Sequence, residues 1–296
     1  MTSLCGIHVP LVTPFTAADT VDGEALEGLA HAVLADGAAG IVALGTTAEA
    51  GTLDAAERRR VVEVCVRVGR DRGAVVTVGA GGGDTRACAA ALADLVRWPE
   101  IGYALVPVPS FVRPSQAGVV AHFATLARSA PVPLIVYHVP YRTGRPLDAA
   151  CLTELGRLPG VVGVKYAAGA IDEQTVRLFA DPPPRFAVLA GDDVFLSPML
   201  ALGATGGVLA SAHLATGRFA ELVAAWRDGE VARARALGAA LSRLSAALFA
   251  EPNPAVVKGV LHAQGRIRTA GVRLPLLPAG PGAVDAALAR LAGLAG

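Results

Sequence analysis

The chain has 296 residues, of which 53% are hydrophobic and 17% are charged, and its formal net charge at pH 7 is +1. This balance excludes an intrinsically disordered chain, which combines low hydrophobicity with high net charge. It also argues against nucleic acid or an anionic membrane as a partner, because an extended basic field is needed to attract them. A chain of this length can form one large domain or two smaller ones.

Eight short apolar segments rich in valine and isoleucine alternate with eight amphipathic segments. The predicted strands are 7–13, 40–45, 74–80, 103–108, 133–139, 161–167, 186–192 and 206–211. The predicted helices are 24–37, 54–70, 84–97, 115–129, 148–157, 172–180, 193–202 and 214–227. The residues expected to cap helix N-termini are Asp54, Asp84, Ser115, Asp148 and Asp172.

This alternation predicts a parallel sheet covered by helices. Eight units in an unbroken series favour an α/β protein with a closed (β/α)8 TIM barrel, which typically has about 250 residues. An open doubly wound sheet is the alternative. The tail predicts helices only, at 229–249, 254–264 and 281–294. We therefore expect a barrel over 1–227 and a C-terminal helical extension over 228–296.

Three features bear on the location of the protein. The segment 194–217 carries no Asp, Glu, Lys or Arg and is long enough to raise the question of a membrane span. Its proline and glycines favour a short helix, a turn and a buried strand instead. The first residues lack the basic and apolar regions of a signal peptide. The four cysteines match no disulfide framework or zinc-ligand spacing, so a metal-free cytoplasmic protein is expected.

Lysine is rare in this chain. Of its 26 basic side chains, only Lys165 and Lys258 are lysines. A lysine amine can lose its proton and attack a carbonyl carbon, which an arginine cannot do. Lys165 follows apolar residues at the end of the sixth predicted strand, and active sites of such barrels lie at the carboxyl ends of the strands. We predict that its amine forms an imine, although a lysine that ends a strand commonly points to solvent.

Other strand ends carry groups that suit the same chemistry. Tyr137 ends the fifth strand and could move protons, or it could be a core aromatic residue. Thr46 and Thr47 offer hydroxyl and backbone N–H groups to a carboxylate, or they could form an ordinary capping turn. Arg142 could bind a second carboxylate, although an arginine on a loop is usually a solvated charge.

Two patterns that suggest other chemistry are interpreted as structural. The glycine-rich segment 79–83 lacks the lysine of a phosphate-binding loop and is read as a tight turn. Asp192 and Asp193 lack a third metal ligand and are read as helix-capping residues. The sequence thus predicts neither a nucleotide site nor a metal site.

The sequence resembles the dihydrodipicolinate synthase / N-acetylneuraminate lyase family of class I aldolases over nearly its whole length. The motifs that carry the resemblance are Gly45-Thr46-Thr47-x-Glu49, Arg113-Pro114-Ser115, Tyr137-x-Val139-Pro140-x-Arg142-Thr143-Gly144, Gly163-Val164-Lys165, Gly191-Asp192-Asp193 and Asn253-Pro254-x-x-Val257-Lys258. Arg142 and the last motif are closer to the synthase branch than to the sialic acid lyases.

The resemblance implies that pyruvate, or another 2-oxo acid, binds as an imine on Lys165, with no cofactor and no metal. It implies a proton shuttle at Tyr137 and a homotetramer of a cytoplasmic lyase in lysine biosynthesis. The remaining roles implied are a proton relay at Thr46, carboxylate binding at Thr46 and Thr47, a backbone carbonyl near the imine at Val208, substrate binding at Gly191, and binding of the carboxylate of aspartate semialdehyde at Arg142.

Phe111 departs from the family pattern and keeps a second function open. Synthases of the family carry a tyrosine at this position, which reaches across from a neighbouring subunit to complete a proton relay, and phenylalanine has no hydroxyl. The alternative is therefore a pyruvate-dependent aldolase or dehydratase that acts on a sugar acid or another aldehyde, such as an N-acetylneuraminate lyase-like or 2-keto-3-deoxy sugar acid enzyme. A more remote alternative is a non-catalytic barrel that binds small acids.

Overall fold

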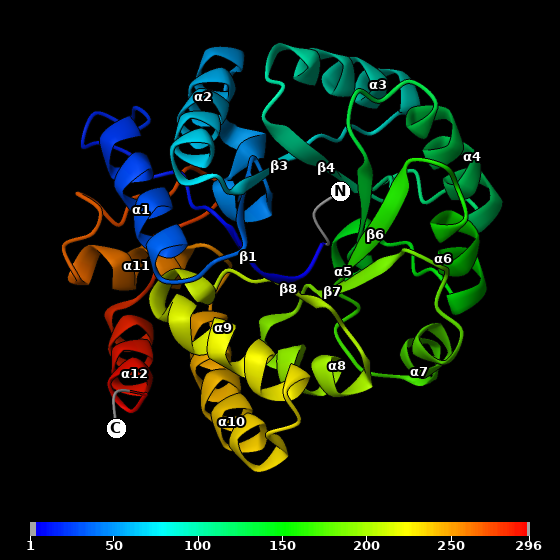
Figure 1. Ribbon diagram of the computed structural model, residues 1–296. Coiled ribbons are helices and arrows are strands. Elements are labelled where there is room, and N and C mark those ends of the chain that lie inside the picture. The colour runs from blue at the N-terminus through cyan, green and yellow to red at the C-terminus, as the bar shows by residue number, and fades with distance from the viewer. Residues whose placement is uncertain (1–3, 295–296) are drawn as a thin grey trace. The chain divides into compact units, whose positions relative to one another are not determined.

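The computed structural model describes residues 4–294, and its eight strands follow one another in a closed barrel in the order β1 to β8 (Figure 1). Residues 1–3, the start of the segment for which no signal peptide is expected, lie outside the described residues. The strands are β1 Gly6–Pro10, β2 Gly40–Ala43, β3 Val75–Gly79, β4 Ile101–Pro107, β5 Leu134–His138, β6 Val161–Tyr166, β7 Ala187–Ala190 and β8 Gly206–Val208. The predicted α/β barrel is confirmed.

Each predicted helix is present with small shifts at its ends. The helices of the barrel are α1 Gly23–Ala35, α2 Ala55–Arg72, α3 Thr85–Ala93, α4 Gln116–Ala127, α6 Ala149–Gly156, α7 Glu173–Ala180, α8 Leu196–Leu202 and α9 Ala212–Arg227. The tail forms α10 Val231–Leu248, α11 Ala255–Ala263 and α12 Pro281–Ala292. All five predicted N-caps accept a backbone N–H of the first helical turn, as their short polar side chains allow.

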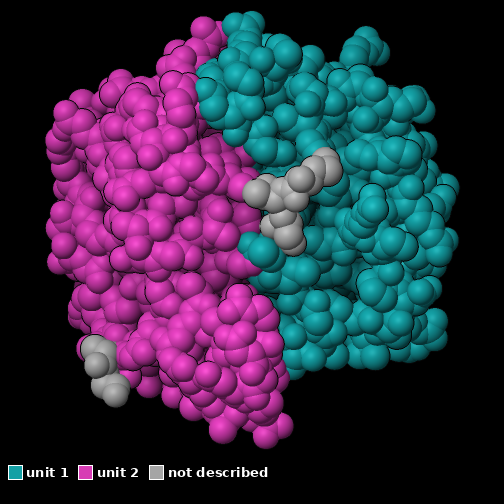
Figure 2. Space-filling model, viewed as in Figure 1, with its two compact units in different colours: residues 1–5, 77–207 teal, residues 6–76, 208–296 magenta. Residues whose placement is uncertain are grey.

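The chain divides into two compact units, which Figure 2 colours separately. The first contains residues 1–5 and 77–207, and the second contains residues 6–76 and 208–296. In the first, α3, α4, α6 and α7 lie outside the strands β4 to β7 (Figure 1). In the second, α9 packs against α10, and α10 packs against α12. The boundary expected at 227/228 stays a prediction.

Two predicted strands end early because their backbone groups find other partners. The first was expected to reach residue 13, but the N–H of Val12 donates to Nε2 of His213 at 3.1 Å. The last was expected to reach residue 211, but the carbonyl of Ala210 accepts the N–H of His213 at 3.2 Å, which turns the chain into α9. These ends leave Val208 as the last residue of β8.

The segment 194–217 contains the predicted helix, turn and strand. Helix α8 is followed by Gly203, whose φ of +115° is favourable only for glycine, and then by β8. Among the helices of residues 4–294, none has the length and apolar content needed to cross a membrane.

One short helix was not predicted from the sequence. Helix α5, Pro140–Thr143, is separated from the end of β5 by the single residue Val139 and is followed by Gly144, whose φ is +68°. Proline suits the first position of a helix, because it lacks the N–H that would have no partner there. This helix carries Tyr141 and Arg142 at the carboxyl end of β5.

Candidate active site

Lys165 and Tyr137 are direct neighbours in the first unit. The parallel register of β5 and β6 pairs the two residues, so their side chains leave the sheet at the same level. Both side chains are buried, and the Lys165 Nζ lies 4.3 Å from the centroid of the Tyr137 ring. An amine beside a phenol can attack a carbonyl carbon while the phenol transfers the protons that the attack requires.

Gly191 makes room for the stem of Lys165. Its N–H donates to the carbonyl of Tyr166 at 2.7 Å, which fixes the chain just after β7 against β6. A Cβ atom at this position would lie 2.9 Å from Cγ of Lys165 and 2.9 Å from Cβ of Ala167. A residue larger than glycine at position 191 would therefore collide with the side chain of Lys165.

Asp192 lies next in the chain, and its carboxylate joins α5 to the loop that follows β6 in the same unit. Oδ1 accepts the Tyr141 hydroxyl at 3.3 Å, and Oδ2 accepts the N–H of Gly169 at 2.7 Å. Burial raises the pKa of Asp192, and these two donors and the charge of Lys165 oppose that shift. The predicted capping role is wrong for Asp192, because its side-chain oxygens bind these donors and do not cap the following turn.

Arg142 and Tyr141 are both exposed at the carboxyl end of β5. The Arg142 guanidinium carbon lies 5.6 Å from the centroid of the Tyr141 ring. Much of the Tyr141 ring is exposed, but partial burial of its hydroxyl raises the pKa of that group, and the nearby Asp192 adds to this effect. The phenol therefore keeps its proton and donates to Asp192, while the guanidinium is accessible to a carboxylate from solvent.

Phe111 lies on the loop between β4 and α4, with 96% of its surface exposed. The loop is tied to the end of α5, because Nε of Arg113 donates to the carbonyl of Gly144 at 2.7 Å and Arg145 donates to the carbonyl of Arg113 at 3.0 Å. Phe111 and Arg113 have φ values of +67° and +46°, which are uncommon for residues with side chains. These contacts hold an exposed aromatic ring on a loop of defined conformation.

Thr46 and Thr47 lie in the second unit, in the 3₁₀ turn η1, Thr46–Ala48, that follows β2. Thr46 is exposed, whereas Thr47 is buried. Its Oγ1 accepts a hydrogen bond from Nδ2 of Asn253 at 3.0 Å. Val208 belongs to the same unit and is buried on β8. The sequence had shown Asn253 only as part of a motif, and its bond to Thr47 crosses 206 positions of the chain.

Metal-ligating side chains do not gather in the described part of the chain. Within residues 4–294, no group of three or more His, Cys, Asp or Glu side chains could hold a metal ion. The groups suited to chemistry in the first unit are the Lys165 amine, the Tyr137 phenol and the Arg142 guanidinium. Those in the second unit are the two hydroxyls of η1.

Comparison with known proteins agrees with the motifs. A model of the dihydrodipicolinate synthetase family matches residues 3–288. A 4-hydroxy-tetrahydrodipicolinate synthase of Salinibacter ruber is 40% identical over 276 residues, which cover 92% of this chain and 89% of that protein. A 4-hydroxy-tetrahydrodipicolinate synthase 2 of Clostridium acetobutylicum is 33% identical over 273 residues, which cover 92% of this chain and 94% of that protein.

Solved structures show the same relationship. A chloride-inhibited dihydrodipicolinate synthase of Acinetobacter baumannii in complex with pyruvate superimposes with a TM-score of 0.92 at 31% identity, covering 98% of this chain and 99% of the other. A dihydrodipicolinate synthase of Thermotoga maritima gives a TM-score of 0.92 at 30% identity, covering 98% of each chain. Motifs, fold and relatives agree, and the chain belongs to the dihydrodipicolinate synthetase family.

Proposed function

We propose that the protein is a lyase of the class I aldolase type that acts as a 4-hydroxy-tetrahydrodipicolinate synthase and condenses pyruvate with aspartate semialdehyde. The observation that carries the proposal is the buried Lys165 amine beside the Tyr137 ring, in a chain whose relatives bear this name. The product, 4-hydroxy-tetrahydrodipicolinate, would be a cyclic precursor of lysine.

The reaction begins at Lys165. Its neutral amine attacks the ketone carbon of pyruvate, and loss of water leaves an imine. Loss of a methyl proton converts the imine into an enamine, whose carbon attacks the aldehyde. The amino group of the semialdehyde then displaces Lys165 and closes the ring. The protonated imine accepts the electron pair in this sequence, so the proposal includes no metal and no organic cofactor.

The other site residues have supporting roles in this proposal. Tyr137 moves protons to and from the carbon and oxygen atoms that react, and Thr46 passes them on. Thr46 and Thr47 bind the pyruvate carboxylate, and Arg142 binds the carboxylate of the aldehyde. The two remaining assignments are a backbone carbonyl near the imine at Val208 and a substrate contact at Gly191.

We also propose that the enzyme works as a homotetramer in the cytoplasm. Phe111 and Val112 are 96% and 66% exposed on a loop held in a defined conformation, which supports burial of this loop by a second copy. The exposed thiol of Cys5 would remain reduced in the cytoplasm. Sedimentation of the wild type and of Phe111→Ser tests this assembly. We expect the variant to associate more weakly than the wild type.

A second candidate follows from the same Phe111. Because its ring cannot pass a proton, the enzyme could serve an aldehyde derived from a sugar acid, with the same imine on Lys165. The exposed Arg142 favours the first candidate, since a guanidinium suits an aldehyde that carries a carboxylate. Rates with aspartate semialdehyde and with glyceraldehyde, each with pyruvate, separate the two.

Borohydride trapping tests the common step. Borohydride reduces an imine to a stable secondary amine, and peptide mass spectrometry then locates the adduct. We expect pyruvate to be attached at Lys165. An unmodified protein would refute the aldolase chemistry and favour a barrel that only binds small acids.

A further inference from the structure

Lys258 is wholly buried in α11 and has three partners. Its Nζ donates to Oε1 of Glu49 at 2.6 Å and to the carbonyl of Gly271 at 2.7 Å. It also lies 4.1 Å from the centroid of the Phe15 ring. Burial lowers the pKa of the Lys258 amine, and Glu49 opposes that shift. The reaction proposed above uses neither member of this buried ion pair.

Glu49 is the residue at which the turn η1 ends. It has a left-handed backbone with φ of +53°, which is uncommon for a residue with a side chain, and its N–H donates to the carbonyl of Thr46 at 3.1 Å. Its second oxygen, Oε2, accepts the backbone N–H of Arg273 at 2.8 Å. Both carboxylate oxygens therefore hold this disfavoured backbone in place.

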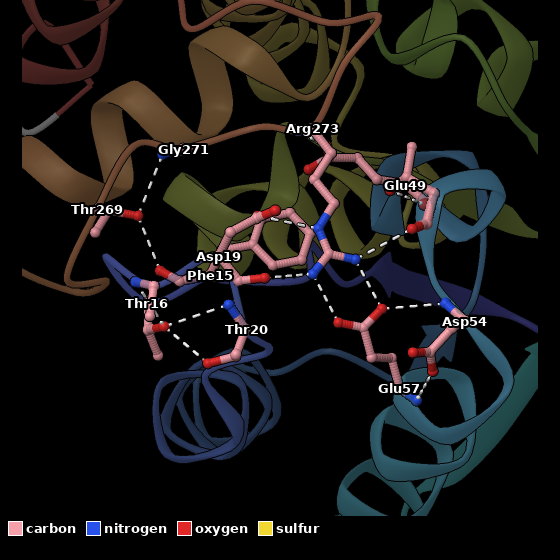
Figure 3. Close-up of polar contacts among 12 residues, drawn as sticks. Phe15, Thr16, Asp19, Thr20, Glu49, Asp54, Glu57, Thr269, Gly271 and Arg273 are labelled. Carbon is pink, nitrogen blue, oxygen red and sulfur yellow. Dashed lines mark hydrogen bonds and ion pairs between the residues drawn. The ribbon is translucent and has the colours of Figure 1, made fainter.

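Arg273 extends the network to α2 and to the segment that precedes α1. Figure 3 shows its guanidinium bonded to both oxygens of Glu57, at 2.6 and 2.7 Å, and to Asp19 at 3.0 Å. The guanidinium carbon lies 4.3 Å from the centroid of the Phe15 ring, over which Lys258 also lies. The segment that contacts Glu49 is thus itself firmly anchored.

The other residues of the turn are bound from the same unit. Asn253, just before α11, donates to the Thr47 hydroxyl at 3.0 Å. The Thr13 hydroxyl donates to the carbonyl of Ala48 at 2.7 Å. Together with the bonds of Lys258 and Arg273 to Glu49, these contacts fix the turn at three successive residues, and three of the four partners come from the C-terminal helical extension.

We propose that Lys258 and Glu49 are positioning residues that set the Thr46–Thr47 turn for binding the carboxylate of the oxo acid. The inference rests on the proposed function, in which these threonines bind that carboxylate. A compact ammonium fits the position because it satisfies Glu49 and a backbone carbonyl within one small buried space. An arginine would need room for a planar group and for its additional N–H donors.

The test measures imine formation as a function of oxo-acid concentration by borohydride trapping at Lys165. The variants are Lys258→Met, Lys258→Arg and the double variant Glu49→Gln/Lys258→Met, which removes both buried charges and so preserves folding. Val260→Ala, at another buried position of α11, is the control for loss of stability alone. Pyruvate is compared with methyl pyruvate, which keeps the ketone but has no carboxylate.

We expect the half-saturating pyruvate concentration to rise at least about tenfold in all three variants of the pair, equivalent to about 1.4 kcal/mol. Trapping with methyl pyruvate should change little, and Val260→Ala should keep the wild-type preference for pyruvate. An unchanged pyruvate dependence, an equal loss with both ketones, full function in Lys258→Arg, or a double variant that does not fold would each overturn the inference. Failure of the wild type to be trapped would instead refute the proposed function itself.

Discussion

Replacing Gly191 by alanine would place a methyl group where the stem of Lys165 already lies. The added Cβ would be 2.9 Å from Cγ of Lys165, 2.9 Å from Cβ of Ala167 and 3.1 Å from the carbonyl oxygen of Tyr166. Unstrained carbon atoms stay about 3.5–4.0 Å apart. The backbone of Gly191 lies outside the left-handed region, so the variant tests this steric contact and not a backbone preference.

The magnitude follows from two opposing terms. Overpacking of a well-filled site costs about 1–3 kcal/mol. Alanine also restricts the unfolded chain, which stabilises the fold by about 0.4–1 kcal/mol. From the middle of each range we expect a net loss of about 1.3 kcal/mol in the free energy of unfolding. If Lys165 moves by about 1 Å to relieve the collision, the rate of imine formation should fall about 100-fold.

The assay compares urea denaturation with the rate of borohydride trapping by pyruvate. Gly118→Ala on α4 is the matched control in the same unit, because its added Cβ would come no closer than 3.4 Å to Pro114 and Ser115, which is the near edge of van der Waals contact. The control should keep the wild-type trapping rate. Wild-type stability together with wild-type trapping in Gly191→Ala would refute the reasoning that the glycine makes room for Lys165.

Three further predictions concern the site and the pH dependence of stability. Lys165→Arg should abolish turnover of pyruvate with aspartate semialdehyde and leave the circular dichroism spectrum unchanged, since a guanidinium stays protonated; substantial turnover would contradict the imine. Arg142→Ala should lower kcat/KM about 10- to 100-fold for the carboxylated aldehyde and less for glyceraldehyde, and equal losses would contradict its role. Burial lowers the pKa of His138 and of His213 to about 4. In the unfolded chain a histidine takes up its proton near pH 6.5, so between about pH 6.5 and about pH 4 the unfolded state binds more protons than the folded state. Lowering the pH from 7 to 5 should therefore lower the free energy of unfolding by about 2 kcal/mol per histidine. Urea denaturation at fixed protein concentration checks this, and equal stability at the two pH values would contradict it.

The fold was predictable because its signals are local. Continuous apolar strands and amphipathic helices repeat along the chain, and five of the helix starts are marked by a capping residue such as Asp54 or Asp172, whose side chains accept the expected N–H groups. Helix α5 was missed because it has only four residues and no apolar period. Its signals were the proline at its start and the glycine at its end, which also fit an ordinary turn.

The candidate site was only partly predictable, because several of its contacts join distant positions. Lys165 and Tyr137 could be chosen from residue chemistry and strand order, and the register of β5 and β6 places them side by side. The bond from Tyr141 to Asp192 spans 51 positions, and no local pattern marks it. Capping was a reasonable prediction for Asp192 from its neighbours alone, but partners on α5 and on the loop after β6 determine what its carboxylate does.

The scarcity of lysine applies equally to Lys258, which the sequence left without a role. Charge alone does not explain why it is retained, because arginine serves ion pairs elsewhere in this unit, as Arg273 does with Glu57. Lys258 differs because its side chain has no exposed surface and because its ammonium group donates to one carboxylate and one backbone carbonyl. Its partner Glu49 is 209 positions away, so the pairing could not be read from the sequence. The two lysines therefore use different properties that arginine lacks: Lys165 an amine that can lose its proton, and Lys258 a compact charge that fits a closed space.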